Sequence, residues 1–222
     1  MHIVYNIGIL ILAYLMGSIP TSVWIGKALF GIDIRERGSK NAGATNAMRI
    51  LGWKAGLSVL FIDVLKGWLA VNLIHLTNYY IPETGDFIEF QLLLGIAAIL
   101  GHIFPVYVGF RGGKGVATLF GLVLAINPEP TLICIGVFVI TLIITKYVSL
   151  SSMIAAFNFP ILVIFVFKTT TPSLVLFSLI LAVLLLFTHQ KNIERLLRKE
   201  EKKVLFLMSK RRREMERLKQ SA

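Results

Sequence analysis

Charged residues and cysteines are both scarce in this chain of 222 residues, and each scarcity excludes a class of protein. Charged residues make up 16% of the sequence and hydrophobic residues 56%, whereas an average soluble domain holds about 25% charged residues. A soluble globular domain is therefore excluded, and the mean hydropathy of +0.77 indicates an integral membrane protein. The single cysteine, Cys134, excludes a disulfide within the chain, and its apolar surroundings favour core packing over a nucleophilic role.

Histidines are few as well, and the basic residues do not form a nucleic-acid footprint. The four histidines, at positions 2, 75, 102 and 189, lack the spacing to carboxylates that a metal site requires. We therefore expect no metal site and no organic cofactor.

The net charge of +11 comes from basic residues that follow one side of a membrane, and no nucleic-acid-binding module is recognisable. A nucleic-acid partner is not expected.

The chain is rich in apolar segments of the length that membrane helices need. A hydrocarbon core of about 30 Å takes roughly 17–25 helical residues, and shorter segments suit cavity-lining positions. Asn127-Pro128-Glu129-Pro130 is either a break within one long helix or a turn. We favour a turn in water, because two prolines would leave backbone groups without hydrogen bonds in lipid. We expect the first segment to remain as a span rather than a cleaved signal peptide. The seven apolar segments are 3–25, 55–76, 87–108, 116–126, 131–145, 152–167 and 173–188.

The distribution of Lys and Arg predicts the topology, since these residues accumulate on the cytoplasmic side. Seven spans place 26–54, 109–115, 146–151 and the tail from 189 on one side, and these segments carry nearly all the basic residues. The connections at 77–86 and 127–130 carry acids and no Lys or Arg. The sequence thus predicts an all-α integral membrane protein of seven transmembrane helices, with the N-terminus outside and the C-terminus in the cytoplasm. We expect a membrane domain over residues 1–197 and a basic tail over 198–222, as an amphipathic or a solvated helix.

Two glycine-bearing loops lie on the predicted cytoplasmic side, one from Gly38 to Asn46 and one at Gly112-Gly113-Lys114-Gly115. Glycines let backbone N–H groups approach an oxyanion, and a helix that starts after such a loop favours an anion. The second loop is not a nucleotide-binding P-loop, because Gly109 is one residue too close to the lysine and a glycine follows it. We expect the loops to hold phosphate; a flexible basic turn is the plainer alternative. The expected contacts are Ser39, Asn41, Gly43, Thr45, Asn46, Arg49, Gly112, Gly113, Lys114 and Gly115.

Ionisable residues inside spans are costly in lipid, so each is a candidate functional residue. Asp63 and Lys66 are three apart on one helical face and can neutralise each other. His102 lies near a span end and can hydrogen-bond to the neighbouring loop. We expect these three to support the site. After the last span, His189 and Asn192 project together if the segment is helical, and can contact a phosphate or carbonyl group.

Five motifs in order carry a resemblance to a known family. They are Gly17-Ser18-Ile19-Pro20; the first loop with Arg49; Asp63-x-x-Lys66-Gly67; Gly101-His102-x-Phe104-Pro105 leading to Gly112-Gly113-Lys114-Gly115; and His189-x-x-Asn192-Ile193-x-Arg195-Leu196-Leu197. Up to about Leu197 the chain resembles the bacterial acyl-phosphate:glycerol-3-phosphate acyltransferase family. The resemblance implies a seven-helix enzyme of the bacterial cytoplasmic membrane whose site faces the cytoplasm. It implies transfer of a fatty acyl group from acyl phosphate to the 1-hydroxyl of glycerol 3-phosphate, which gives lysophosphatidic acid for phospholipid synthesis.

The residue types fit that chemistry without an acyl-enzyme. An acyl phosphate is a mixed anhydride with a good leaving group, so direct attack by a hydroxyl needs positioning and charge neutralisation. Small polar groups of the first loop would hold one phosphate. Arg49 and Lys114 would neutralise this phosphate and the leaving group. His189 and Asn192 would orient the other phosphate or the attacking hydroxyl. The catalytic residues of this hypothesis are Ser39, Arg49, Lys114, His189 and Asn192.

The chain departs from the family pattern at two places. Lys40 stands where a small residue is common, and Arg198-Lys199-Glu200-Glu201 replaces Gly-x-Glu, so a role for Glu200 does not carry over.

The alternative function from another class is a membrane transporter for a small organophosphate anion. Polar clusters concentrated on one side, with only Asp63 and Lys66 deep in a span, disfavour it.

Overall fold

The computed structural model describes residues 2–204, which fold into helices and connecting loops without a strand in this range. The chain divides into two compact units. Within the described residues, unit 1 comprises 2–131 and 170–177, and unit 2 comprises 132–169 and 178–204. The predicted all-α class is confirmed.

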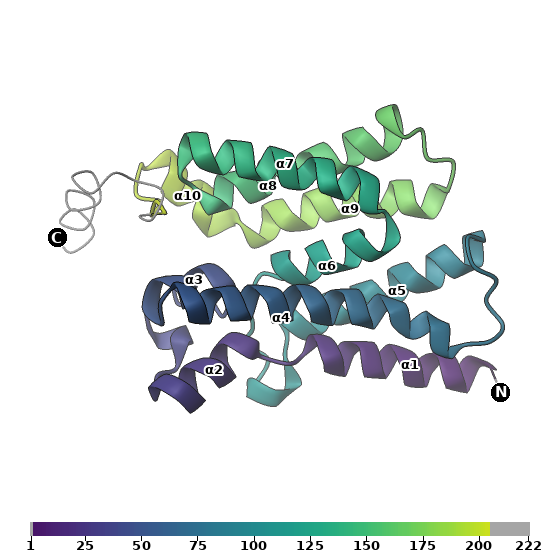
Figure 1. Cartoon of the computed structure of the whole chain (residues 1–222), viewed down its shortest axis with the longest axis horizontal. Helices are drawn as coiled ribbons and strands as arrows, with labels where there is room; N and C mark the ends of the chain where they lie inside the picture. Colours follow the sequence, from purple (N-terminus) through teal and green to yellow (C-terminus); the bar gives the residue numbers. More distant parts are fainter. Residues whose placement is uncertain (1, 205–222) are drawn as a thin grey trace. The chain divides into compact units, whose positions relative to one another are not determined.

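Unit 1 is a layered bundle in which α1, α4 and α5 pack together, α6 packs on α4, and the short α3 packs on α4 (Figure 1). Three 3-10 turns, η1 (Ile34–Glu36), η2 (Leu73–Leu76) and η3 (Val106–Val108), lie in its connections. Its α-helices are α1 (His2–Gly17), α2 (Thr21–Phe30), α3 (Ala44–Ile50), α4 (Trp53–Asn72), α5 (Gly85–Ile103) and α6 (Val116–Ile126).

Glycines at the helix contacts allow this close packing. A Cβ atom added at Gly17 would lie 2.0 Å from the Ala98 carbonyl oxygen, and one at Gly67 would lie 2.1 Å from the Thr118 carbonyl oxygen. Such contacts let helix backbones approach each other, as is usual for helices packed in a membrane. The outward side of α4 carries exposed Phe61 and Trp68, which suits a surface in contact with lipid.

The first predicted span is broken rather than continuous. Helix α1 ends at Gly17 and α2 begins at Thr21, with a bend of 42° between them. Pro20 has no N–H to continue the helical hydrogen bonding, and a preceding glycine and serine tolerate the bend. The predicted segment 3–25 therefore consists of two helices, which qualify as one span if the bent pair is counted together, and the break exposes the Ile19 carbonyl to a side chain of α4, as described below.

Unit 2 contains the remaining helices, with α7 and α9 each beginning in unit 1. Pro160 lies near the end of α8 and is followed directly by the π-helix η4 (Leu162–Val166), as expected where a helix loses a backbone donor. Residues 198–204 are not helical, and the part of the predicted tail helix beyond them lies outside the described residues. The α-helices are α7 (Pro128–Thr145), α8 (Val148–Ile161), α9 (Pro172–Thr188) and α10 (Gln190–Leu197).

The proposed turn at residues 127–130 takes a shorter form than expected. Helix α6 ends at Ile126 and α7 begins at Pro128, so the two are separate helices. Both prolines fall in the first turn of α7, where backbone N–H groups have no intrahelical partner and proline costs nothing. The Thr131 hydroxyl donates to the carbonyls of Val123 and Asn127 and so closes the junction.

Every predicted apolar segment is largely helical, but the helices differ in their ability to span. Four helices, counted with adjoining short turns, are long and apolar enough to cross a membrane within the described residues. The pairs α1–α2 and α9–α10 also qualify if each bent pair is one span, with bends of 42° and 60°. Helix α6 has 11 residues, which rise about 16 Å. The number of seven spans and the orientation stay predictions.

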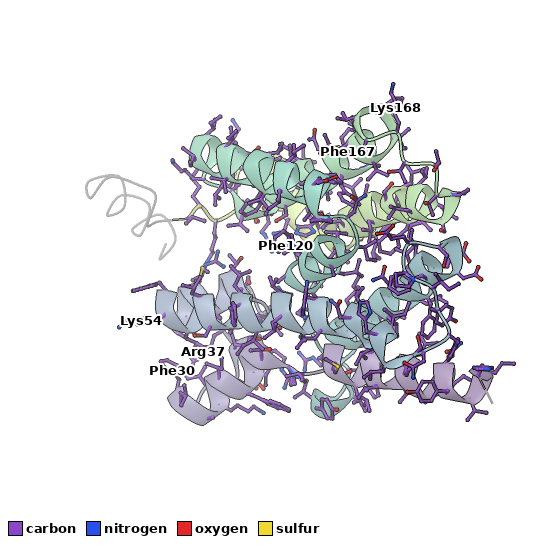
Figure 2. The ribbon with its side chains drawn as sticks, turned by 45° about the vertical axis from the view of Figure 1, so that its right-hand side comes forward. Phe30, Arg37, Lys54, Phe120, Phe167 and Lys168 are labelled. Atoms are coloured by element: carbon purple, nitrogen blue, oxygen red, sulfur yellow. The ribbon has the colours of Figure 1, made fainter. Side chains whose placement is uncertain are left out.

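One end of unit 1 gathers basic residues. Figure 2 shows Phe30, Arg37 and Lys54 at the same end, where α2 finishes and α4 begins. The opposite end of unit 1 carries the start of α1 and the connection between α4 and α5 (Figure 1). The two glycine-bearing loops belong to the connections of unit 1.

Candidate active site

Asn46 organises the first glycine-bearing loop. Its side chain is 1% exposed, and its Oδ1 accepts a hydrogen bond of 2.9 Å from the Ser39 backbone N–H. Its Nδ2 donates to the carbonyls of Ile34, Arg37 and Asn41 at 3.0–3.1 Å. Asn46 therefore fixes the backbone of the loop with both ends of its amide. The sequence predicts that this side chain contacts phosphate; in the structure both ends of its amide have partners within the protein.

The first loop holds two residues with left-handed backbone. Gly38 has φ +61°, and a Cβ there would lie 2.4 Å from Asn46 Oδ1, so glycine is required. Lys40 has φ 59°, a conformation that costs a non-glycine residue. A glycine at this position would adopt this conformation without strain.

The side chains predicted to bind phosphate in the first loop lie on its solvent side. Ser39, Thr45 and Arg49 are exposed, whereas Asn41 is partly buried. Thr45 and Arg49 are four residues apart on α3 and share a face. A Cβ at Gly43, the residue before α3, would lie 3.0 Å from the Asn41 amide nitrogen. The Thr45 hydroxyl and the Arg49 guanidinium thus lie on one exposed face of α3.

The second loop folds back on the end of α5. The N–H of Gly112 donates to the Ile103 carbonyl and the N–H of Gly113 donates to the His102 carbonyl. A Cβ at Gly112 would lie 1.9 Å from the His102 carbonyl oxygen, and one at Gly113 would lie 2.3 Å from His102 Nε2. These glycines are needed for close packing, and their N–H groups donate to carbonyls at the end of α5. Gly115, with φ +78°, then precedes α6.

The two loops meet within unit 1. A Cβ at Gly113 would lie 2.8 Å from the Ala42 carbonyl oxygen, so the second loop lies directly against the first. A small cavity at this contact is lined by Gly112 and Gly113, by Thr21 after the α1–α2 break, and by Lys66 of α4. Lys114 follows this contact in sequence and is partly buried. The two loops, which the sequence predicts on one side of the membrane, are therefore in contact.

A buried polar network lies below the loops. Lys66 Nζ is 2.8 Å from Asp63 Oδ1, and the two residues are 4% and 2% exposed. Lys66 also donates to the Ile19 carbonyl in the α1–α2 break, and the Thr21 hydroxyl donates to Asp63 Oδ1. The expected pairing of Asp63 with Lys66 is confirmed.

His102 connects the network with the second loop. Its Nδ1 lies 3.0 Å from the Thr118 hydroxyl of α6 and 3.8 Å from Asp63 Oδ1. Its carbonyl accepts from Gly113. The expected hydrogen bond to the loop is therefore made by the backbone of His102, while the ring joins α5 to α6.

The last motif lies in unit 2, where Glu201 is the central acceptor. His189 precedes α10, and its Nδ1 lies 2.9 Å from the Leu185 carbonyl oxygen. Asn192 Nδ2 donates to Glu201 Oε1 at 2.6 Å. Glu201 also accepts from Arg195 Nε at 2.7 Å and from the Ser149 hydroxyl at 2.7 Å. The acid that contacts Asn192 and Arg195 is therefore Glu201, one residue after Glu200.

Two carboxyl groups outside the spans have lowered pKa values. Burial opposes ionisation of Glu201, but hydrogen bonds from Arg195, Ser149 and Asn192 outweigh it and lower the pKa of the carboxyl group. The hydrogen bond from the Arg35 guanidinium holds the pKa of Asp33 well below its usual range. Both carboxylates therefore carry a negative charge at neutral pH.

The described residues contain no group of three or more His, Cys, Asp or Glu side chains placed to hold a metal ion. The candidate residues of the two loops and of the polar network lie in unit 1, and those of the last motif lie in unit 2.

Known proteins similar to this chain cover most of its length. A family model described as Glycerol-3-phosphate acyltransferase matches residues 7–199. A glycerol-3-phosphate acyltransferase from Chlorobium phaeobacteroides is 40% identical, with 90% of this chain and 97% of that protein covered. One from Fusobacterium nucleatum is 44% identical, with 89% and 97% covered.

A solved structure has the same fold. The crystal structure of PlsY (YgiH), an integral membrane glycerol 3-phosphate acyltransferase, in its glycerol 3-phosphate form, matches with a TM-score of 0.79 and 33% identity over 90% of this chain and 96% of that chain. The lysphosphatidic acid form of PlsY matches with a TM-score of 0.76. The chain therefore belongs to the glycerol-3-phosphate acyltransferase family and is an acyltransferase enzyme of a bacterial membrane.

Proposed function

We propose that this enzyme transfers a fatty acyl group from acyl phosphate to the 1-hydroxyl of glycerol 3-phosphate, and that it releases lysophosphatidic acid and phosphate. The observation that carries this proposal is the meeting of the two glycine-bearing loops at Ala42 and Gly113 in unit 1. Each loop has a cation near it, Arg49 in α3 after the first loop and Lys114 within the second, which suits a reaction in which both substrates bear phosphate.

In the proposed reaction the hydroxyl oxygen of glycerol 3-phosphate attacks the carbonyl carbon of the acyl phosphate. The new carbon–oxygen ester bond forms, the bond to the phosphate oxygen breaks, and the phosphate leaves with the electron pair. The hydroxyl proton passes to His189 or to a phosphate oxygen. No acyl-enzyme is formed, because the anhydride is already activated and needs only alignment and charge neutralisation.

The structure supports a division of roles among the candidate residues. We assign phosphate contact to Ser39, Asn41, Thr45, Arg49 and Lys114, together with backbone groups near Gly43 and Gly115. We assign Asn46, Gly112 and Gly113 to shaping the loops, since their hydrogen-bonding groups are engaged within the protein. His189 and Asn192 would orient the second phosphate or the attacking hydroxyl. Asp63, Lys66 and His102 support the loops from below.

The proposed setting is the bacterial cytoplasmic membrane, with the site on the cytoplasmic side. Basic residues of unit 1 that gather at one end support this orientation (Figure 2). Glycerol 3-phosphate would then arrive from the water, and the acyl chain of the donor would lie among apolar helices.

The test is formation of lysophosphatidic acid by the purified protein in detergent, from palmitoyl phosphate and glycerol 3-phosphate, compared with Lys114→Ala and with Lys54→Ala as a matched control. Lys54 is an exposed lysine at the start of α4, over the Trp53 ring, and should be dispensable. Product from the wild type and from Lys54→Ala, with a loss of at least 100-fold in Lys114→Ala, supports the proposal. Equal rates in the two variants would remove Lys114 from the site.

The role of His189 can be separated by the pH dependence of His189→Ala. A rate that recovers as pH rises would indicate that His189 removes the proton, because hydroxide or a deprotonated substrate can replace a missing base. A loss that does not depend on pH would assign His189 to binding.

A further inference from the structure

Arg35 joins η1, which precedes the first glycine-bearing loop, to the segment directly before the second loop through hydrogen bonds to backbone carbonyls. Its Nη1 donates to the Val108 carbonyl at 2.8 Å and to the Arg111 carbonyl at 3.3 Å. Arg111 directly precedes Gly112, so these contacts hold the outer turn of the second loop. Arg35 itself lies in η1, in the connection that leads to the first loop.

The same guanidinium is held on its own side by Asp33. Arg35 Nε donates to Asp33 Oδ1 at 3.0 Å and Nη2 donates to Oδ2 at 2.7 Å, which is a two-bond contact with the carboxylate. Asp33 Oδ1 also accepts from the Arg35 backbone N–H and caps η1. Side-chain exposures of 15% and 13% show that the pair is mostly shielded from water.

The contacts continue from Arg35 into the first loop. The carbonyl of Ile34, the neighbour of Arg35, accepts a hydrogen bond from Asn46 Nδ2, and Asn46 Oδ1 accepts from the Ser39 N–H. One continuous series of bonds thus runs from the second loop through Arg35 and η1 to Ser39. All of these residues belong to unit 1.

We infer that Arg35, held by Asp33, is a positioning residue that sets the spacing of the two loops so that both contact the phosphate of glycerol 3-phosphate. This inference rests on the proposed function. The N–H donors of Arg35 bond to Asp33 and to backbone carbonyls within the protein. Arg35 therefore affects the substrate by positioning the loops and not by contact with the phosphate.

The geometry requires arginine specifically. Two carbonyls and a carboxylate are reached from different nitrogens of one planar fork, whereas a lysine ammonium is a single point donor on a flexible stem. Arg35→Lys therefore keeps the charge and breaks the connection. Asp33→Asn keeps the shape of the other partner and weakens its hold on the guanidinium.

The experiment is a steady-state comparison of wild type, Arg35→Lys, Asp33→Asn and the double variant, with glycerol 3-phosphate varied and palmitoyl phosphate in excess. Arg37→Lys is the matched control, since Arg37 is an exposed arginine two residues away (Figure 2). Thermal unfolding of each variant in detergent identifies variants that fail to fold. If Arg35→Lys does not fold, Asp33→Asn provides the same measurement.

We expect a rise of at least tenfold in the KM for glycerol 3-phosphate in Arg35→Lys, a kcat within threefold of wild type, and wild-type constants in Arg37→Lys. The double variant should have a KM no higher than that of the worse single variant, because the two residues act as one unit.

An unchanged KM in Arg35→Lys, or a fall in kcat alone, would overturn the inference. Multiplicative effects in the double variant would overturn the pairing with Asp33. Failure of the proposed function is distinguishable, because the wild type would then form no lysophosphatidic acid; the inference would fall with it.

Discussion

Lys66 forms a buried ion pair with Asp63 at 2.8 Å and at the same time donates to the Ile19 carbonyl in the break between α1 and α2. Lys66 thus connects the charged pair of the second span to the break in the first. Two charges withdrawn from water are tolerated here because each has a further hydrogen bond. Lys66 donates to the Ile19 carbonyl in the break, and the Thr21 hydroxyl of α2 donates to Asp63.

Removal of one member of this pair should be far worse than removal of both. Lys66→Met leaves the Asp63 carboxylate buried without its cation and should destabilise the protein by about 3–5 kcal/mol. The double variant Asp63→Leu/Lys66→Met should recover much of that loss. Thermal unfolding in detergent measures both, and Lys54→Met, at an exposed site, provides the control. A double variant as unstable as the single one would contradict this account.

Asn46 should tolerate no change of its amide to a carboxylate. In Asn46→Asp the group that donates to three carbonyls becomes an acceptor that faces them. A buried polar group without its partner costs about 1–3 kcal/mol, more when charged, so both melting temperature and activity should fall. Asn78→Asp, at an exposed asparagine, is the comparison. Equal stability of the two variants would show that Asn46 does not organise the loop.

Lys40→Gly should stabilise the protein. The left-handed backbone at Lys40 costs a non-glycine residue about 1–2 kcal/mol, and the entropy of glycine takes back about 0.5–1 kcal/mol. We expect a net gain of roughly 0.5–1 kcal/mol, seen as a higher melting temperature. Lys40→Ala removes the charge and keeps the strain, so it should give no gain. A gain of the same size in Lys40→Ala would assign the effect to charge.

Protonation of Glu201 in acid should lower the stability of the protein. Its folded pKa lies below the ordinary value of 4.5, because bonds from Arg195, Ser149 and Asn192 outweigh burial. Its contribution is therefore fully present above the unfolded pKa and is lost as pH falls through the folded value. Melting temperatures of wild type and Glu201→Gln, measured from pH 6 downward, should converge in acid. A constant difference at all pH values would contradict the ionised network.

The sequence predicted those parts of the fold that depend on short-range patterns. Apolar segments located the helices, and a spacing of three residues predicted the pairing of Asp63 with Lys66, because both signals are local in the chain. The break after Gly17 was missed, since Pro20 lies inside an apolar segment whose hydropathy alone favours continuity.

The roles within the site were harder to predict because they depend on backbone that the sequence does not reveal. The carbonyls that engage Asn46 come from residues 34, 37 and 41, which converge only in the folded loop. The return of Glu201 to Asn192 depends on a turn in which the backbone N–H of Glu201 donates to the Arg195 carbonyl. An acid soon after α10 was the available signal, and the family pattern directed attention to its neighbour.

The choice of acyl donor is the most direct test of the central claim. Purified enzyme should be given glycerol 3-phosphate with either palmitoyl phosphate or palmitoyl-CoA, and both lysophosphatidic acid and released phosphate should be measured. We predict product from palmitoyl phosphate alone, with one phosphate released for each lysophosphatidic acid formed. Product from palmitoyl-CoA, or no product from palmitoyl phosphate with folded protein, would contradict acyl-phosphate-dependent transfer.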